Sequence, residues 1–252
     1  MSTESLLLSS AMAVAAGLVG CFAVMRRMAL AGDALSHVAL PGIGVAFALK
    51  IHPVVGAVAM LFFGALLVWS FEDRSRLGTE TLVGVVFSTA LALGSIMMSD
   101  ERLIDTLLGQ AGAISPAEAV FGLAGAGLVI AFVIIRKHAL VVSLVSPDIA
   151  RTAGVNVRLL NLLYLQMFAL TVALGLRYLG VLLMGSLIII PAATAKRLSN
   201  NLNQMLSIAA VSAVIATVAG SAAAYWLGRE TGPLIVIAAA AGFLLTLFRS
   251  QR

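Results

Sequence analysis

Asp33 and His37 are the two residues of this sequence whose types and spacing are best suited to binding a ligand. They stand four positions apart, so on a helix both side chains lie on one face with Cβ atoms ~5–6 Å apart. A carboxylate oxygen and an imidazole nitrogen at that spacing can bind one divalent cation between them. This donor set suits zinc or manganese, and the lack of a thiolate argues against a softer metal. Two ligands are too few for a closed site, so a second copy of the chain or further residues would have to complete it.

The segment that carries this pair is apolar and follows Arg26 and Arg27, which mark the cytoplasmic membrane surface. At ~1.5 Å per residue, Asp33 and His37 then lie ~8 and ~14 Å along a helix. A charged side chain inside a span costs at least ~2.5 kcal/mol, and such residues normally face a pathway or a partner. The alternative is that Asp33 caps a helix that begins later and that His37 makes a hydrogen bond in the core. A Pro-Gly pair at 41–42 is expected to break or bend this helix, as in the discontinuous helices that line transport sites.

A second candidate segment follows an apolar run that is expected to end at Pro191. A short helix-forming stretch with two cations comes next, and it lies on the side predicted to be cytoplasmic. One interpretation is a helix cap followed by a basic anchor. The other is a short amphipathic helix along the membrane face that docks a soluble partner. The residues concerned are Ala192, Ala193, Thr194, Ala195, Lys196 and Arg197.

The elements that must position both segments are membrane-spanning helices. The chain is 61% hydrophobic and 11% charged, whereas a soluble domain carries about 25% charged residues. Apolar runs of ~18 residues or more recur along its length, which is the pattern of spanning helices. We therefore expect an all-α polytopic membrane protein with one domain over residues 1–252. About nine spans are predicted, with eight as the alternative because the seventh is short: 5–24, 28–49, 53–71, 81–98, 118–135, 159–175, 178–191, 205–227 and 233–248.

The distribution of basic residues predicts the orientation of these spans. Most of the 16 Lys and Arg residues fall in alternate loops, and the loops richer in these residues face the cytoplasm. The poorer loops hold only Lys50, Arg102, Arg177 and Arg229. With nine spans, the N-terminus lies outside and the C-terminus in the cytoplasm.

Two Ser-Pro sequences predict helix starts, because serine is a good N-cap and proline is favoured at the first helical position. Ser115 and Pro116 lie at the end of a long external loop, 99–117. Ser146 and Pro147 lie in a cytoplasmic loop, 136–158, where they begin a short interfacial helix.

The sequence lacks the motifs of common hydrolytic sites. It contains no Gly-Lys dipeptide, so it has no P-loop, and it has neither a His-Glu-x-x-His nor a Gly-x-Ser-x-Gly sequence. We therefore expect that the chain is not an enzyme. If ATP drives transport, a separate subunit must hydrolyse it.

Together, these segments resemble the permease subunits of bacterial ATP-binding-cassette importers for zinc, manganese and related divalent metals. The most specific matches are the stretches Gly-Asp-Ala-Leu-Ser-His at 32–37 and Ile-Pro-Ala-Ala-Thr-Ala at 190–195. Ser-Pro-Asp-Ile-Ala at 146–150, Gly-Val at 154–155 and Gly-Pro at 232–233 also match, in the same order along the chain.

The resemblance implies a type II-like importer permease in the bacterial plasma (inner) membrane. It implies a homodimer with one metal path at its two-fold axis, two cytoplasmic ATPase subunits and an extracytoplasmic metal-binding protein. Asp33 and His37 match the positions regarded as metal-coordinating in that path, and residues near 192–203 match a helix that couples the permease to the ATPase. The metal is then a substrate, no cofactor is permanently bound, and ATP is used by the partner.

Glu230 precedes the Gly-Pro pair and is expected at the external mouth of the path, where it either attracts cations or is simply solvated. Two other functions stay open at this point. A secondary carrier driven by protons or sodium would use Asp33 and His37 as a proton relay. A permease for chelated iron would need a wider cavity without acidic ligands, and Asp33 argues against it.

Overall fold

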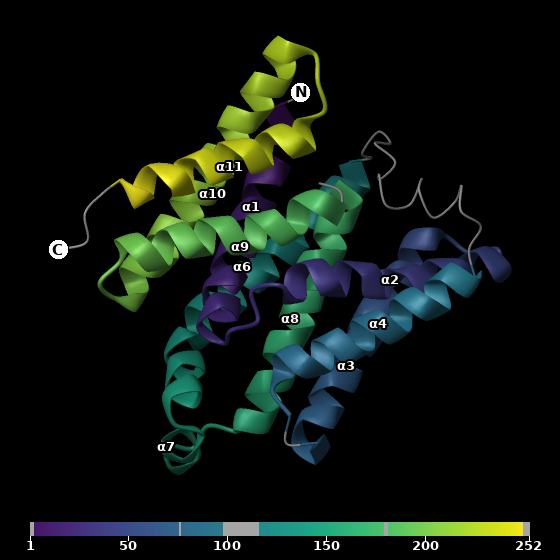
Figure 1. Ribbon diagram of the computed structural model, residues 1–252, viewed down its shortest axis with the longest axis vertical. Helices are drawn as coiled ribbons and strands as arrows, with labels where there is room; N and C mark the ends of the chain where they lie inside the picture. The colour runs from purple at the N-terminus through teal and green to yellow at the C-terminus, as the bar shows by residue number, and fades with distance from the viewer. Residues whose placement is uncertain (1–2, 76, 98–115, 179–180, 249–252) are drawn as a thin grey trace.

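The protein is described by a computed structural model that covers residues 3–75, 77–97, 116–178 and 181–248. The regular structure of these residues is helical (Figure 1). Its helices are α1 (Thr3–Met25), α2 (Ala31–Ala48), α3 (Pro53–Ser75), α4 (Thr79–Met97), α6 (Pro116–Val145), α7 (Pro147–Thr152), α8 (Val157–Tyr178), α9 (Val181–Leu198), α10 (Leu202–Leu227) and α11 (Thr231–Leu247).

Each of the nine predicted spans overlaps one of these helices, but the predicted number of nine spans is not confirmed. Within the described ranges, seven helices are long and apolar enough to cross a membrane, namely α1, α2, α3, α4, α6, α8 and α10. The apolar helix α11 is shorter, with 17 residues. The predicted external loop 99–117, with Arg102 and Ser115, lies almost wholly outside the described residues.

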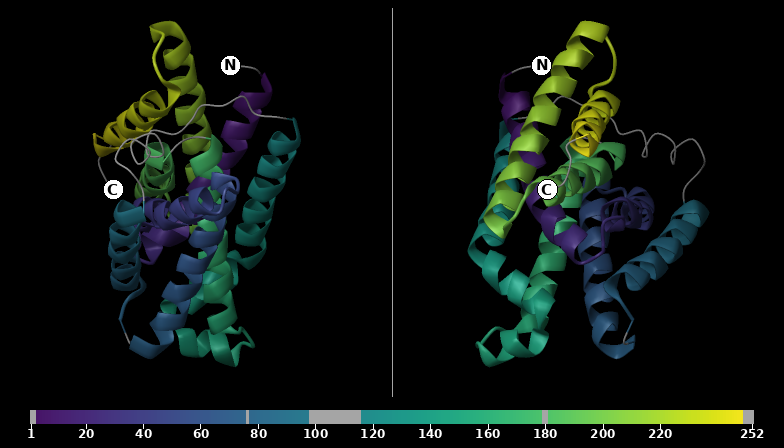
Figure 2. Two further views of the ribbon diagram at one scale, coloured as in Figure 1. Left: turned by 90° about the vertical axis from the view of Figure 1, so that its right-hand side faces the viewer. Right: turned by 60° about the vertical axis from the view of Figure 1, so that its left-hand side comes forward.

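The helices pack in two groups (Figures 1 and 2). Helices α2, α3 and α4 contact one another and form the α2–α4 group. Helices α1, α6, α9, α10 and α11 form the main bundle, in which α1 contacts α6, α9 and α10. Helix α8 contacts both groups, and α2 also contacts α9. The start of α2 is therefore held at the junction between the two groups.

Small residues allow the helices of the bundle to approach closely, as is usual in lipid. Gly20 of α1 lies against the backbone of α9, and a Cβ atom there would overlap the carbonyl oxygen of Ile188. Gly42 of α2 and Gly56 of α3 face each other in the same way. The backbones, and not long side chains, thus set the helix spacing at these crossings.

Helix α2 continues through Pro41 to Ala48, as the predicted span 28–49 requires, so the Pro-Gly pair does not break it. Two predictions about helix ends are wrong. Helix α9 likewise continues through Pro191 to Leu198. A proline removes only one donor from a helix, and neighbouring helices can compensate for that loss in a membrane protein. Helix α6 runs on to Val145, past the predicted end at residue 135, because no helix-breaking residue occurs before Pro147.

The predicted short helix after Ser146 is confirmed. Ser146 is the N-cap of α7, its Oγ accepts a hydrogen bond from the amide of Ile149, and Pro147 occupies the first turn. Figure 1 shows α7 at the opposite end of the molecule from the turn between α10 and α11.

Candidate functional site

Asp33 is the third residue of α2 and lies in its first turn. The N-cap is Leu30, which makes no side-chain capping bond, so the alternative that Asp33 caps this helix is wrong. The side chain of Asp33 is exposed, whereas its neighbours Gly32 and Leu35 are buried. An accessible carboxylate thus stands at the junction of the two helix groups.

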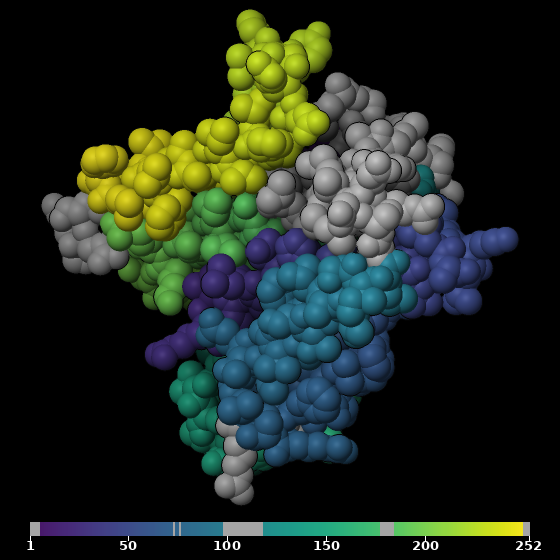
Figure 3. Space-filling view, turned by 45° about the vertical axis from the view of Figure 1, so that its right-hand side comes forward, coloured from purple at the N-terminus to yellow at the C-terminus, as the bar shows by residue number. Residues whose placement is uncertain are grey.

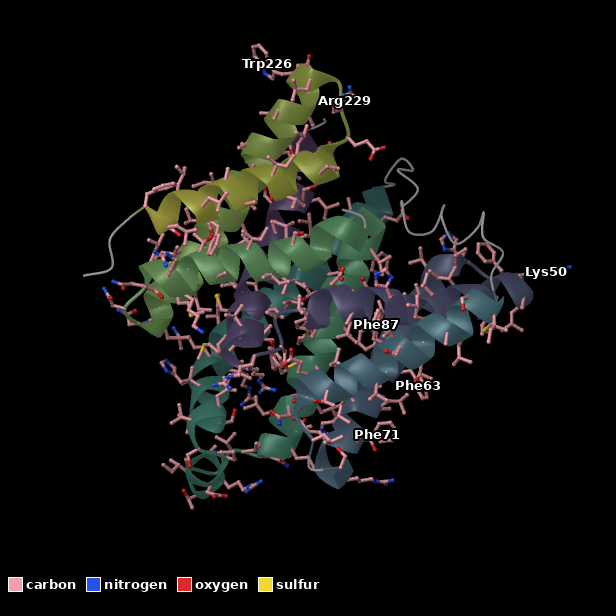
Figure 4. The ribbon with its side chains drawn as sticks, viewed as in Figure 1. Lys50, Phe63, Phe71, Phe87, Trp226 and Arg229 are labelled. Carbon is pink, nitrogen blue, oxygen red and sulfur yellow. The ribbon has the colours of Figure 1, made fainter. Side chains whose placement is uncertain are left out.

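His37 lies one turn further along the same helix and is half-buried. Its ring centroid is 5.6 Å from that of Phe87 on α4, at an interplanar angle of 54°, and Figure 4 shows Phe87 where α4 passes α2. The Nδ1 atom of His37 is buried and, among the residues that the structure describes, has no hydrogen-bond partner. Buried polar atoms nearly always have partners, which include ordered water and ions, so this nitrogen is able to bind one of these.

Helix α9 forms a wall beside Asp33. A Cβ atom at Gly185 would lie 3.2 Å from the Cβ of Asp33, and one at Gly32 would lie 3.0 Å from the Cδ1 of Ile188. At these distances a side chain on either glycine would push its neighbour by a few tenths of an ångström. The first turn of α2 is therefore held directly against the backbone of α9.

Asp33 and His37 do not form a complete metal site by themselves. Among the residues that the structure describes, no group of three or more His, Cys, Asp or Glu side chains is arranged to hold a metal ion. Zinc and manganese need more protein or water ligands than these two side chains supply. Further ligands must come from water, from the residues outside the described ranges or from a second copy of the chain.

Glu230 lies far along the chain from this pair, at the start of α11. It is exposed, occupies the N-cap position and makes no side-chain capping bond. The turn that holds it follows Gly228, whose left-handed φ of 61° ends α10. This turn projects from the body of the molecule (Figure 3), and Figure 4 shows Trp226 and Arg229 at its tip.

The segment after Pro191 forms the last turns of α9 and is not a separate surface helix. Ala192, Thr194 and Ala195 are buried, while Lys196 is exposed. Arg197 does not point freely to solvent: its Nη2 and Nε atoms lie 3.2 and 3.4 Å from the carbonyl oxygen of Thr246, at the end of α11. Only part of the predicted segment is therefore accessible to a partner.

The turn between α9 and α10 is the accessible part of this region. Asn201 is the N-cap of α10, and its Oδ1 accepts a hydrogen bond of 2.9 Å from the amide of Gln204. The Oε1 of Gln204 in turn accepts one from the amide of Asn200, and Lys137 of α6 donates to Asn203 at 2.7 Å. These bonds make the turn a well-defined polar surface.

The sequence does not predict the contacts that Arg26 makes in the structure. Arg26 donates a hydrogen bond of 2.8 Å from Nη2 to the Oδ1 of Asn161, and its guanidinium carbon lies 4.4 Å from the centroid of the Tyr164 ring. Tyr164 itself donates to the carbonyl oxygen of Val19 at 3.2 Å. The arginine was interpreted only as a marker of the membrane surface. No sequence pattern indicates a partner that is 135 positions away.

Three known proteins with similar sequences are all membrane components of metal transport systems. The chain is 30% identical over 240 residues to the high-affinity zinc uptake system membrane protein ZnuB of Haemophilus influenzae, covering 93% of this chain and 92% of that protein. It is 30% identical to the manganese import system permease protein ScaB of Streptococcus parasanguinis, covering 97% and 89%. It is 32% identical to the chelated iron transport system membrane protein YfeD of Yersinia pestis, covering 93% and 80%.

A solved structure has the same fold. The chain is similar to a chain of PsaBC from Streptococcus pneumoniae, solved in complex with a Fab, with a TM-score of 0.81 and 26% identity over 97% of this chain and 90% of that one. Residues 1–250 match the model of the ABC 3 transport family. The chain therefore belongs to the ABC 3 transport family of metal transporter permeases.

Proposed function

We propose that this chain is the permease subunit of an ATP-driven importer of a divalent metal ion, zinc or manganese, in the bacterial plasma membrane. One observation carries the proposal. Asp33 is exposed and His37 keeps an unpartnered Nδ1 on the same helix, at the junction of the two helix groups. An exposed carboxylate oxygen and an imidazole nitrogen on one helix suit a passing cation.

The incomplete ligand set supports a homodimer. Within the described ranges the chain brings no third His, Cys, Asp or Glu to the pair. If two copies meet around a shared axis, two Asp33 and two His37 side chains can contribute to one path. An open or partly hydrated site holds an ion weakly enough to release it, which transport requires.

Transport in this proposal proceeds by alternating access. An extracytoplasmic metal-binding protein docks outside, near Glu230, and releases the ion into the path. ATP binding draws two cytoplasmic ATPase subunits together, and the α9–α10 turn with Lys196 transmits this movement to the permease. The ion leaves for the cytoplasm when the path opens inward. The exposure of Lys196 and the defined geometry of the turn support this contact.

Two alternatives predict different transport behaviour. A secondary carrier would move metal without ATPase subunits. A permease for chelated iron would have to accommodate a bulkier ligand, but an exposed carboxylate at Asp33 favours a bare cation.

The test is metal uptake into proteoliposomes that contain the permease with or without its ATPase subunits. Uptake of labelled zinc or manganese should require both ATP and the ATPase subunits. Uptake that persists without them would instead establish a secondary carrier. If the complete complex accumulates a ferric chelate but neither free cation, the iron alternative holds.

A further inference from the structure

A small cleft lies between the adjoining ends of α3 and α4 and the neighbouring helices α6 and α8, on the side of the molecule predicted to be cytoplasmic. It has a volume of about 210 Å³ and is lined by Arg26, Ser143, Leu144 and Asn161 on one wall and by Glu72 and Thr79 on the other. The first wall belongs to α6, α8 and the connection after α1, and the second to the adjoining ends of α3 and α4. The cleft therefore lies between parts of the protein that are joined mainly through α8 and the start of α2.

One wall of the cleft carries a fixed positive charge. Arg26 is held by its hydrogen bond to Asn161 and by the face of Tyr164, while its Nε is buried without a hydrogen-bond partner. Burial lowers the pKa of Arg26, while Tyr164 and Glu72 act in the opposite direction. An arginine stays protonated in proteins at neutral pH. A half-buried cation, whose Nε–H has no partner among the described residues, is thus available at this wall.

The other wall carries a negative charge. The carboxylate of Glu72 accepts a hydrogen bond of 2.5 Å from the Oγ1 of Thr79, which ties the end of α3 to the start of α4. The ion pair found among the described residues is the surface pair Arg151–Asp148, so Arg26 and Glu72 face the same cleft without forming one. A ligand that is purely cationic or purely anionic would be repelled by one wall. The positive charge of Arg26 and the negative charge of Glu72 therefore complement each other across the cleft.

We infer that Arg26 and Glu72 are positioning residues, which form an ion pair when the cleft closes and thereby hold the α2–α4 group in a second position during transport. This inference rests on the proposed function. Arg26 lies immediately before the tight connection at Arg27, where φ is 60°, and α2 begins four residues later at Ala31. Closure of the cleft moves the helix that carries Asp33 and His37 relative to α9. The new bond is charge-assisted and forms in a partly dry site, where such bonds are strong.

A reversible crosslink tests the movement. In a Cys21→Ala background, which removes the only cysteine, Thr79→Cys and Ser143→Cys place one thiol on each wall. The complete transporter is oxidised without nucleotide and with ATP plus vanadate. The yield of disulfide should differ several-fold between the nucleotide-free and the ATP-vanadate samples. The disulfide should also stop metal uptake until a reductant is added. The control pair Glu80→Cys with Ser143→Cys uses the exposed neighbour of Thr79 and should crosslink equally poorly in both states.

A charge variant tests the ion pair itself. Glu72→Gln keeps an acceptor for Thr79 but loses the charge, so it should lower kcat for uptake by about fivefold or more with little change in KM for the metal. Glu80→Gln, the matched control outside the cleft, should behave as the wild type. The inference is overturned if crosslinking is independent of nucleotide or if Glu72→Gln transports normally. These results leave the proposed function intact, because only loss of ATP-dependent uptake by the wild type would contradict that.

Discussion

Gly185 of α9 stands directly against Asp33 of α2, close enough that a Cβ atom on the glycine would lie 3.2 Å from the Cβ of the aspartate. Asp33, a candidate metal ligand, can lie this close to α9 because Gly185 has no side chain. This contact makes the position of Asp33 sensitive to a residue that has no donor atom of its own.

Replacing Gly185 by leucine should therefore impair transport. The larger side chain must displace either Asp33 or the backbone of α9, and a displacement of about 1 Å at a functional group can reduce a rate by about 100-fold. Metal uptake should fall at least tenfold while the protein still inserts in the membrane. Gly127→Leu on α6 is the matched control, since nothing lies within 4 Å of its Cβ position. Equal uptake by the two variants would show that α9 does not position the site.

Arg197 should contribute to stability, in contrast to its neighbour Lys196. Arg197→Gln removes the charged donor to the Thr246 carbonyl and should lower the free energy of unfolding by about 1 kcal/mol. Lys196→Gln removes an exposed charge and should change it by less than about 0.5 kcal/mol. Thermal unfolding of the purified variants in one detergent measures both effects. A loss of stability in Lys196→Gln alone would contradict the role assigned to Arg197.

Lys196 should instead affect the contact with the ATPase subunits. Lys196→Glu reverses the charge at the accessible end of α9, so less ATPase should copurify with the permease. Arg151→Glu on α7 is the control, because Arg151 is also exposed but pairs locally with Asp148. If Arg151→Glu releases the ATPase and Lys196→Glu does not, α7 is the docking element and the assignment of the α9–α10 turn is wrong.

Gly20 should be among the least replaceable residues of the bundle. A Cβ atom there would overlap the backbone carbonyl of Ile188, which cannot move without shifting α9. Gly20→Ala is expected to destabilise the protein by about 1–3 kcal/mol, as overpacking does in other cores. Gly84→Ala on α4, where nothing lies within 4 Å of the Cβ position, should be neutral or stabilising because alanine favours helices. Unfolding midpoints of the two variants provide the comparison.

Apolarity and local caps predicted the helices well, because both act within a few residues. Every predicted span overlaps a helix, and the start of α7 after Ser146 follows from its own capping chemistry. The continuation of α2 through Pro41 without a break, and of α9 through Pro191, could not be predicted in the same way. A proline breaks a helix only if nothing compensates for the lost hydrogen bond, and that compensation comes from neighbouring helices.

The candidate site was predictable only where its residues share one helix. Asp33 and His37 are linked by their spacing, so the sequence alone places them on one face of α2. The contact of Asp33 with Gly185, the partners of Arg26 and the bond from Arg197 to α11 join distant parts of the chain. These contacts depend on how helices cross, which no periodicity in one segment specifies.

The most direct test of the central claim is ATP-driven uptake of labelled zinc and manganese by transporters that carry Asp33→Ala, His37→Ala or both changes. Each single variant should lower uptake by about tenfold or more, as removal of a metal-site residue usually does. The double variant should be inactive, although the complex still assembles and hydrolyses ATP. If the assembled double variant takes up both metals at the wild-type rate, Asp33 and His37 do not form the metal path.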